Sequence, residues 1–227
     1  MKTGKRIPKA KPEANGSLAD KKTWLSAAKH LAEVDPVLAK VIRAYGPYKF
    51  ELEDGYYEAL VGAIIFQQLA GKAAQAILNR FKNLYDGKIP TPNEYLETPE
   101  SKLRSAGLSP QKISYLKDLC TRLENGTLDL KHLQNLADDE VVRELDEVRG
   151  IGRWTAEMFL MFSLGRTNVL PVDDLGLQKA AQRLYGLEEL PNHDRFEELA
   201  KAWHPYRSIA SIYLWRSVEP PNTPAKW

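Results

Sequence analysis

The sequence predicts an all-α fold of about ten short helices joined by short connections, and three observations favour it. Apolar residues recur at helical spacing, as Ala73, Ile77 and Phe81 do. Residue pairs typical of helix starts punctuate the chain, for example Asp35-Pro36. No segment alternates apolar and polar residues in the manner of a strand ladder.

The first half of the chain is expected to form helices at 24–33, 36–45, 56–68 and 69–85, with an extended stretch near 48–53. Asp35 supplies an N-cap and Pro36 the first helical position, and Gly46-Pro47 ends that helix. The segment YYEALVGAIIFQQ at 56–68 is apolar on nearly all faces. Its length and its Glu, Ala and Gln content favour a buried helix over a parallel strand. We expect Gly71 to mark the corner before the next helix.

Start and stop signals also define the helices of the second half. Ser109-Pro110 begins one helix and Asn125-Gly126 ends it, while Gly165 ends a later one. Helices are therefore expected at 98–107, 110–124, 130–136, 138–146, 153–164, 175–185, 194–203 and 205–217, with an extended segment at 168–176.

Composition excludes several classes of protein. The longest apolar run, ALVGAIIF at 59–66, is far shorter than the ~20 residues that a membrane span needs. The single cysteine, Cys120, rules out a disulfide framework and an iron–sulfur cluster held by four cysteines. The four histidines show no pair at metal-ligand spacing, so a catalytic zinc site is not expected. No apolar segment follows the basic N-terminus, so we expect a protein that is not secreted.

Positive charge is concentrated at the N-terminus. Residues 1–22 carry seven lysines and arginines against two acidic residues, although the net charge of the whole chain is only +2. Such a tail could contact a polyanion, or it could be a disordered solubilising terminus. We expect 1–22 to be a basic, disordered tail.

A glycine pair interrupts a segment that otherwise reads as helix. Gly150-Ile151-Gly152 lies between the expected helices 138–146 and 153–164, and a glycine inside a helix costs about 1 kcal/mol relative to alanine. The pattern predicts a helix–hairpin–helix at 145–157. Free N–H groups at the start of the second helix would form an anion site suited to a DNA phosphate. The alternative is a plain turn that packs two helices.

The wider pattern LxxVxGIGxxTA at 145–156 resembles the helix-hairpin-helix DNA glycosylase superfamily. The resemblance implies two helical subdomains that flank a DNA-binding cleft. It also implies a set of phosphate-binding residues: Arg149, Gly150, Gly152, Arg153 and Thr155. A structural Na⁺ or K⁺ ion at the backbone carbonyls of Asp146, Val148 and Ile151 is implied in the same way, with no cofactor for catalysis.

An acidic pair lies downstream of the hairpin. By itself, Asp173-Asp174 at the start of helix 175–185 is typical of an N-cap and a partner of the helix dipole. The superfamily places its catalytic aspartate at the head of a helix that carries an arginine nine residues on, and Arg183 follows Asp174 by nine. The resemblance therefore implies that Asp174 is catalytic, with Asp173 as the alternative.

Two further patterns resemble one branch of that superfamily, the 3-methyladenine DNA glycosylases II. They are WxPYRSxAxxYLW at 203–215 and FQQLAGKAA at 66–74. The first implies that Trp215 lines the base pocket. The second implies that Gln68 and Leu69 fill the space that an extruded nucleotide leaves; without the resemblance, Leu69 would be read as a core residue. The matches span about 57–217, which implies subdomains at 57–165 and at 23–56 plus 166–227, in a short form without an N-terminal β domain.

The resemblance also implies a chemistry. Trp154 and Trp215 would attract a cationic alkylated purine through their rings, worth ~0.5–2 kcal/mol, with Met158 beside them in the pocket. Bifunctional relatives have a lysine where this chain has Trp154, so we expect monofunctional hydrolysis that leaves an abasic site. The expected partner is double-stranded DNA with alkylated bases, bound by a monomer in the bacterial cytoplasm (nucleoid) or the eukaryotic nucleus. The alternatives are a non-enzymatic DNA-binding protein and a glycosylase for other damaged bases, including a strand-cleaving one.

Overall fold

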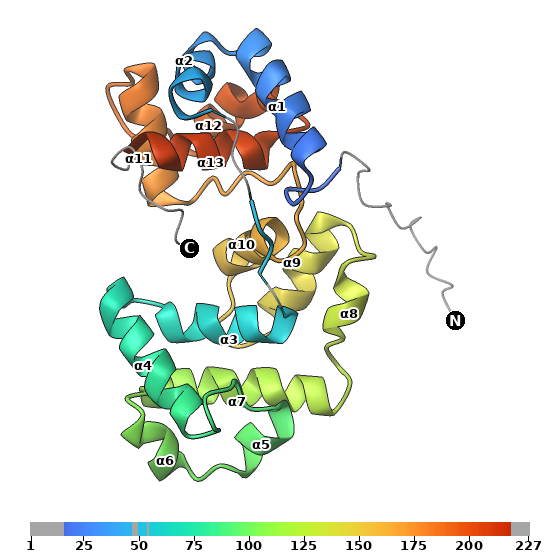
Figure 1. Ribbon diagram of the computed structural model, residues 1–227, viewed down its shortest axis with the longest axis vertical. Coiled ribbons are helices and arrows are strands. Elements are labelled where there is room, and N and C mark those ends of the chain that lie inside the picture. Colours follow the sequence, from blue (N-terminus) through green and yellow to red (C-terminus); the bar gives the residue numbers. More distant parts are fainter. Residues whose placement is uncertain (1–15, 47–49, 54, 219–227) are drawn as a thin grey trace, which may run out of the picture. The chain divides into compact units, whose positions relative to one another are not determined.

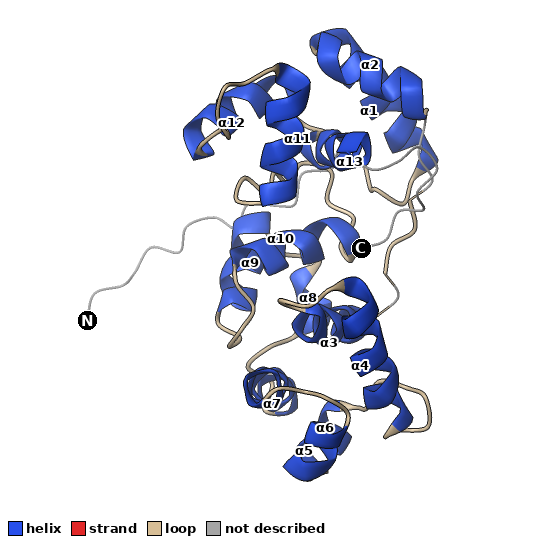
Figure 2. Ribbon diagram, turned by 90° about the vertical axis from the view of Figure 1, so that its left-hand side faces the viewer, coloured by secondary structure: helices blue, strands red, loops and turns tan. Residues whose placement is uncertain are grey.

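The computed structural model describes residues 16–46, 50–53 and 55–218, and their regular structure is entirely helical (Figure 1). No strand occurs within these ranges (Figure 2), so the predicted all-α class is confirmed. The helices are α1 (Lys21–Val34), α2 (Pro36–Tyr45), α3 (Tyr56–Phe66), α4 (Gly71–Asn83), α5 (Pro92–Glu97), α6 (Glu100–Ser105), α7 (Pro110–Glu124), α8 (Leu130–Leu133), α9 (Asp138–Asp146), α10 (Arg153–Phe162), α11 (Leu175–Tyr185), α12 (His193–Ala200), the 3-10 helix η1 (Lys201–Trp203) and α13 (Arg207–Val218).

The described residues form two compact units. Among the described residues, the first unit contains Glu53–Phe159, and the second combines residues 16–52 with residues 160–218. The second unit is therefore discontinuous in sequence, and the division at Phe159 falls inside α10. The sequence predicts the first subdomain at 57–165. None of the described helices is both long and apolar enough to cross a membrane.

The first unit is built around α3 and α7. Helix α3 contacts α4, α7 and α8, and α7 also contacts α5 and α6. The apolar residues of α3 that are buried are Leu60, Val61, Ile64 and Ile65. Each such side chain contributes roughly 1.5–3 kcal/mol when it leaves water, so α3 supplies much of the core of this unit.

The second unit is built around α13. This helix contacts α1, α2 and α11, and every residue from Ser208 to Trp215 is buried. A helix that is buried on all sides lacks a polar stripe, and the buried part of α13 includes the small polar residues Ser208 and Ser211. Trp24 packs edge-on against Tyr213 at a centroid distance of 5.9 Å, which joins α1 to the core.

Asp35 ties the N-terminal helices to the far end of the chain within this unit. Its side chain is 7% exposed in relative terms, and it caps α2 by accepting the N–H groups of Val37 and Leu38. Its other oxygen accepts the hydroxyl of Tyr185 at 2.6 Å and the indole N–H of Trp203 at 2.8 Å. A buried carboxylate needs several donors, and here four donors surround it.

The bounds of four helices agree with the prediction: 36–45, 110–124, 138–146 and 175–185. The bounds of other helices differ from the prediction, for local reasons. The expected helix 56–68 ends at Phe66, and Gly71 is the first residue of α4 rather than the corner. The short helix α5 was not expected; Thr91 begins it through a capping box with Glu94. The last helix begins at Arg207, two residues beyond Pro205.

Candidate active site and nucleic-acid interface

Asp174 is the N-cap of helix α11, which resolves the choice of cap between Asp173 and Asp174 that the sequence leaves open. Its backbone is extended, and its Oδ1 accepts the N–H of Leu177 at 2.6 Å. The carboxylate therefore sits at the positive end of the helix dipole, where negative charge is stabilised. Asp174 is partly exposed, so this carboxylate keeps access to solvent.

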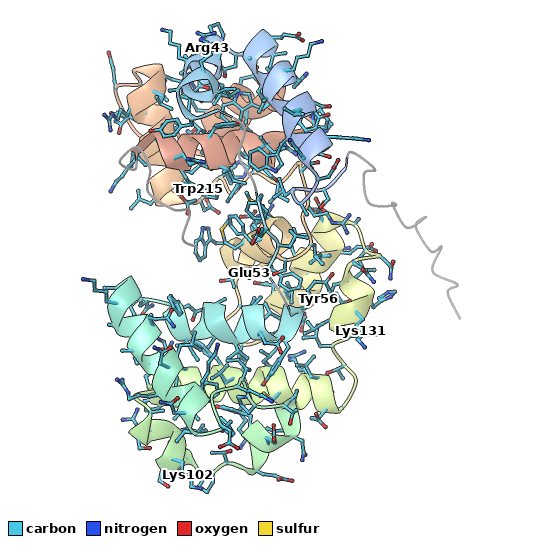
Figure 3. All side chains as sticks on the ribbon, viewed as in Figure 1. Arg43, Glu53, Tyr56, Lys102, Lys131 and Trp215 are labelled. Atoms are coloured by element: carbon cyan, nitrogen blue, oxygen red, sulfur yellow. The ribbon has the colours of Figure 1, made fainter. Side chains whose placement is uncertain are left out.

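Trp215 holds the same carboxylate from α13. Its indole N–H donates to Oδ1 of Asp174 at 2.9 Å, across 41 positions of sequence. The ring is only 6% exposed and packs against Phe162 at a centroid distance of 6.2 Å. Trp215 is labelled in Figure 3, where it belongs to the second unit. A ring fixed by packing and a carboxylate fixed by two donors make a rigid acidic site.

The chain that leads to Asp174 is fastened along the start of α13. The hydroxyl of Ser208 accepts the N–H of Val169 at 2.8 Å, and the N–H of Ser208 donates to the carbonyl of Thr167 at 3.0 Å. Arg207 donates through Nε to the side chain of Asn168 at 2.9 Å. These contacts explain the serine and the arginine of the YRS pattern as anchors for the segment before Asp174.

Glycine at position 176 leaves room beside this carboxylate. A Cβ added at Gly176 would lie 3.2 Å from Oδ1 of Asp174, which is tighter than most real Cβ contacts, and 3.8 Å from the ring of Trp215. The neighbouring Asp173 is exposed. Arg183 lies in the last turn of α11, at the opposite end of that helix from Asp174.

The hairpin of the first unit requires its first glycine. Gly150 has φ +85°, in the left-handed region, and a Cβ added there would collide with the ring of Tyr115 from α7. Gly152 lies outside that region, and a Cβ added to it would meet open space. The two glycines therefore differ. Gly150 is needed for the fold of the turn, whereas Gly152 has free space around the position of a Cβ.

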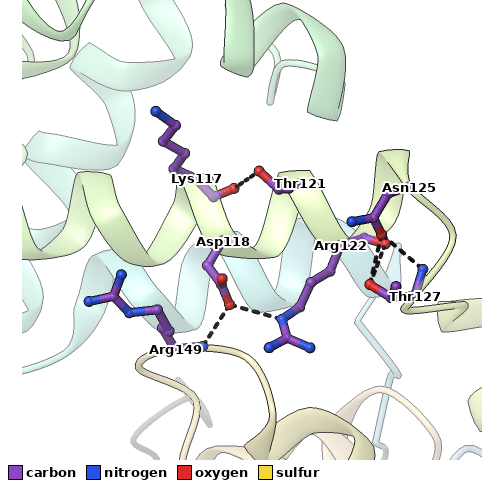
Figure 4. Close-up of polar contacts among 7 residues, drawn as sticks. All are labelled: Lys117, Asp118, Thr121, Arg122, Asn125, Thr127 and Arg149. Atoms are coloured by element: carbon purple, nitrogen blue, oxygen red, sulfur yellow. Dashed lines mark hydrogen bonds and ion pairs between the residues drawn. The ribbon is translucent and has the colours of Figure 1, made fainter.

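Helix α7 also fastens the hairpin by a hydrogen bond. The backbone N–H of Arg149 donates to Oδ2 of Asp118 at 3.0 Å, and the same oxygen accepts Nε of Arg122 at 3.0 Å (Figure 4). Sequence reasoning missed both Asp118 and Tyr115, because only the tertiary fold brings α7 to the turn. The charged side chain of Arg149 is exposed.

The corner between α3 and α4 consists of Gln67, Gln68, Leu69 and Ala70, which we call the corner loop. Gln68 has φ +56°, an uncommon conformation for a residue with a side chain. Leu69 is 38% exposed, which argues against the reading of this residue as core. Non-glycine residues in this region cluster at functional sites, because only surrounding contacts hold them there.

The start of α10 carries most of the other predicted site residues. Trp154 is 44% exposed, and Met158 lies one turn further and is partly exposed. Arg153 pairs with the buried Glu157 through Nε at 2.9 Å, while Thr155 is buried. Trp154, Met158, the hairpin and the corner loop therefore belong to the first unit, and Asp174 and Trp215 to the second.

Cys120 is not a nucleophile candidate. The side chain is buried in α7 and shares a hydrogen bond of 3.4 Å with the hydroxyl of Tyr57. Burial raises the pKa of the Cys120 thiol to about 11. Because reactive cysteines need a lowered pKa, this residue belongs to the core.

The chain is similar to known proteins in sequence and in fold. The family model described as HhH-GPD superfamily base excision DNA repair protein matches residues 61–205. The chain is 35% identical over 182 residues to DNA-3-methyladenine glycosylase 1 of Schizosaccharomyces pombe, which covers 79% of this chain and 80% of that protein. It is 35% identical over 188 residues to the YfjP protein of Bacillus subtilis, which covers 80% of this chain but only 66% of that protein.

Two solved structures have similar folds. One is the Schizosaccharomyces pombe 3-methyladenine DNA glycosylase in complex with abasic DNA, with 33% identity and a TM-score of 0.75, covering 85% of this chain and 96% of that one. The other is a DNA-3-methyladenine glycosidase from Bacillus halodurans, with 38% identity and a TM-score of 0.77, covering 84% of this chain and 88% of that one.

Proposed function

Because the chain belongs to the HhH-GPD superfamily of base excision DNA repair proteins, we propose that it is a monofunctional DNA glycosylase that releases alkylated purines from duplex DNA. The observation that carries the proposal is the carboxylate of Asp174, held at the head of α11 by the N–H of Leu177 and the indole of Trp215. The proposed substrate class follows the name of the Schizosaccharomyces pombe relative at 35% identity, a DNA-3-methyladenine glycosylase.

The chemistry follows from this carboxylate. A glycosylase flips the target nucleotide out of the stack and spends a few kcal/mol on unstacking. Breaking the bond between base and sugar develops positive charge on the sugar. A fixed carboxylate beside that charge stabilises the transition state and can orient or deprotonate the attacking water. Asp174 would act in this way and leave an abasic site.

We propose that Trp154, Trp215 and Met158 each contact the extruded base. The exposed ring of Trp154 suits a flat cationic base, which an electron-rich ring attracts by ~0.5–2 kcal/mol. Trp215 has a second role, because its N–H also fixes Asp174. Position 154 offers no lysine for a Schiff base, which favours hydrolysis over strand cleavage.

The duplex would be bound by the hairpin and the corner loop. Phosphates would approach Gly150, Gly152 and the N–H groups at the start of α10, including that of Thr155, with Arg149 and Arg153 nearby. Gln68 and Leu69 would enter the space left by the flipped nucleotide. We propose that the protein acts as a monomer on double-stranded DNA, in the compartment that holds the genome.

A monovalent ion at the hairpin is part of the proposal. The carbonyls of Asp146, Val148 and Ile151 would hold Na⁺ or K⁺, and that ion would add positive charge beside the phosphate. The carbonyl of Val148 already accepts the N–H of Ile151 at 3.0 Å, and a carbonyl oxygen has a second lone pair for an ion. No cofactor is proposed for catalysis.

Incubation with defined lesions tests the function. Duplexes that carry 3-methyladenine, 7-methylguanine, ethenoadenine or hypoxanthine should lose the methylated purines and gain alkali-labile abasic sites. Borohydride should trap no covalent adduct between protein and DNA. Salt-dependent binding without base release would instead establish the non-enzymatic alternative, and a trapped adduct would establish the strand-cleaving one.

Replacing Trp215 with phenylalanine tests the hold on Asp174. An aromatic ring remains beside Phe162, although phenyl is smaller than indole, and the hydrogen bond to a charged acceptor is lost, so the rate of base release should fall about tenfold. Single-turnover kinetics would measure the rate, and affinity for DNA with a stable abasic analogue should stay unchanged. An unaltered rate would show that the indole N–H does not position the carboxylate.

A further inference from the structure

Gln67 joins two segments of the first unit that the proposed function places on DNA. Its side-chain amide donates to the backbone carbonyl of Gly150 at 2.7 Å, across 83 positions of sequence. Gln67 is the first residue of the corner loop, and Gly150 is the first glycine of the hairpin. A direct hydrogen bond therefore fixes the spacing between the loop and the hairpin.

The hairpin end of this bond is itself anchored. Gly150 packs against the ring of Tyr115, and the preceding N–H of Arg149 donates to Asp118. Both anchoring side chains come from α7, a long helix whose buried face belongs to the core. Gln67 therefore bonds to a carbonyl that has little freedom to move.

The corner loop has a second anchor on the same helix. The ammonium group of Lys112 donates to the carbonyl of Ile65 at 2.7 Å, near the end of α3. Carbonyls in the last turn of a helix lack helical partners, so this cation caps α3 where the loop begins. The N–H of Leu69 also returns to the carbonyl of Phe66 at 3.3 Å.

These contacts hold a conformation that the loop would not favour alone. The left-handed backbone of Gln68 is unfavourable for a residue with a side chain, and Leu69 leaves 38% of its surface exposed. A loop that is ordered before binding avoids the entropy loss of ordering on the ligand. Two hydrogen bonds to other segments of the unit hold this strained loop in place: the bond from Gln67 to Gly150 and the bond from Lys112 to Ile65.

We propose that Gln67 is a positioning residue that holds the corner loop against the hairpin, so that Gln68 and Leu69 meet the duplex in a preformed conformation. The proposal rests on the proposed function in one respect, the contact of these two residues with DNA. Gln67 itself acts through the loop, since its amide is engaged by the carbonyl of Gly150.

The experiment is a binding measurement on full-length variants. Gln67→Met keeps the length of the side chain and removes the donor, so affinity for a duplex with a stable abasic-site analogue should fall about three- to tenfold, the net value of one hydrogen bond. Fluorescence anisotropy would measure it. Gln67→Asn, whose shorter amide does not reach the carbonyl, should lose as much. Gln75→Met is the matched control, because it also replaces a glutamine amide, one that donates to Asn79 at 2.9 Å within the exposed surface of α4.

A double-mutant cycle separates positioning from a structural role. In a Leu69→Ala background there is no wedge to position, so adding Gln67→Met should cause little further loss. Equal losses in both backgrounds, or no loss in either, would overturn the proposal. Thermal melting of each variant checks that a loss of affinity is not a loss of fold.

The readout does not require base release, which keeps this proposal distinct from the proposed function. If the wild-type protein binds the abasic duplex and shows the cycle but releases no base, the glycosylase function fails and the role of Gln67 stands. If it releases base while the cycle is additive, only the role of Gln67 fails.

Discussion

Asp174→Asn is expected to lower the rate of base release by at least several hundred-fold, of the order found when one electrostatic stabiliser is removed from an active site. Asparagine is nearly isosteric and is also a good N-cap, so Oδ1 can still accept the N–H of Leu177 and the indole of Trp215. What disappears is the negative charge that, in the proposed mechanism, faces the sugar in the transition state. Single-turnover kinetics on a duplex with 7-methylguanine would measure the effect.

Asp173→Asn is the matched control for this prediction. Asp173 is the adjacent residue, it carries the same charge, and it is exposed rather than part of the cap. The Asp173 variant should keep a rate close to wild type, and both variants should keep the wild-type melting temperature. A full rate in Asp174→Asn together with a loss in Asp173→Asn would reverse the catalytic assignment.

The local part of the acidic site could be predicted from sequence. Asp174 stands before a helical pattern with the residue type that N-caps favour, and the structure confirms it as the cap of α11. The contact with Trp215 could not be derived in this way, because 41 residues separate the partners and no short-range pattern links them. Resemblance brought both residues to attention, but it assigned Trp215 to the pocket and not to the hydrogen bond.

The corner loop shows how a local rule can be wrong. Glycine breaks helices, so Gly71 is the natural choice for the corner. The structure places the break at Gln67–Ala70, and Gln68 rather than a glycine takes the left-handed conformation. Contacts from Gly150 and Lys112 over-determine this backbone, and they come from other parts of the unit. Tertiary contacts therefore override propensity at the position that the resemblance assigns to DNA.

The sequence predicts the hairpin as a turn, but it does not predict the contacts from α7 that hold this turn in place. Two glycines between helical patterns predict the break, and α9 and α10 end and begin where the sequence places them, at Asp146 and Arg153. The need for glycine at position 150 arises from the ring of Tyr115, which lies 35 residues earlier in the chain. The two glycines look equivalent in sequence, and the structure separates their roles.

Gly150→Ala is expected to destabilise the protein and to weaken its binding to DNA. A left-handed conformation costs a residue with a side chain roughly 1–2 kcal/mol, and overpacking against a ring adds roughly 1–3 kcal/mol. The added methyl group would collide with Tyr115, so the turn or the ring must move. Since about 1 kcal/mol shifts the melting temperature of a chain of this size by about 2–4 °C, calorimetry should show a drop of several degrees.

Alanine variants at two other glycines separate the two causes of this loss of stability, the left-handed backbone and the collision with Tyr115. Gly186 caps α11 with φ +63° and has open space around a Cβ, so Gly186→Ala should show the cost of the left-handed backbone alone. Gly152→Ala adds a methyl group to the hairpin without strain or collision, so it should keep the melting temperature. Any fall in DNA affinity in Gly152→Ala then reports the close approach of a phosphate. If Gly150→Ala melts no lower than Gly186→Ala, the packing of Tyr115 does not fix the hairpin, and the anchoring argument for this turn fails.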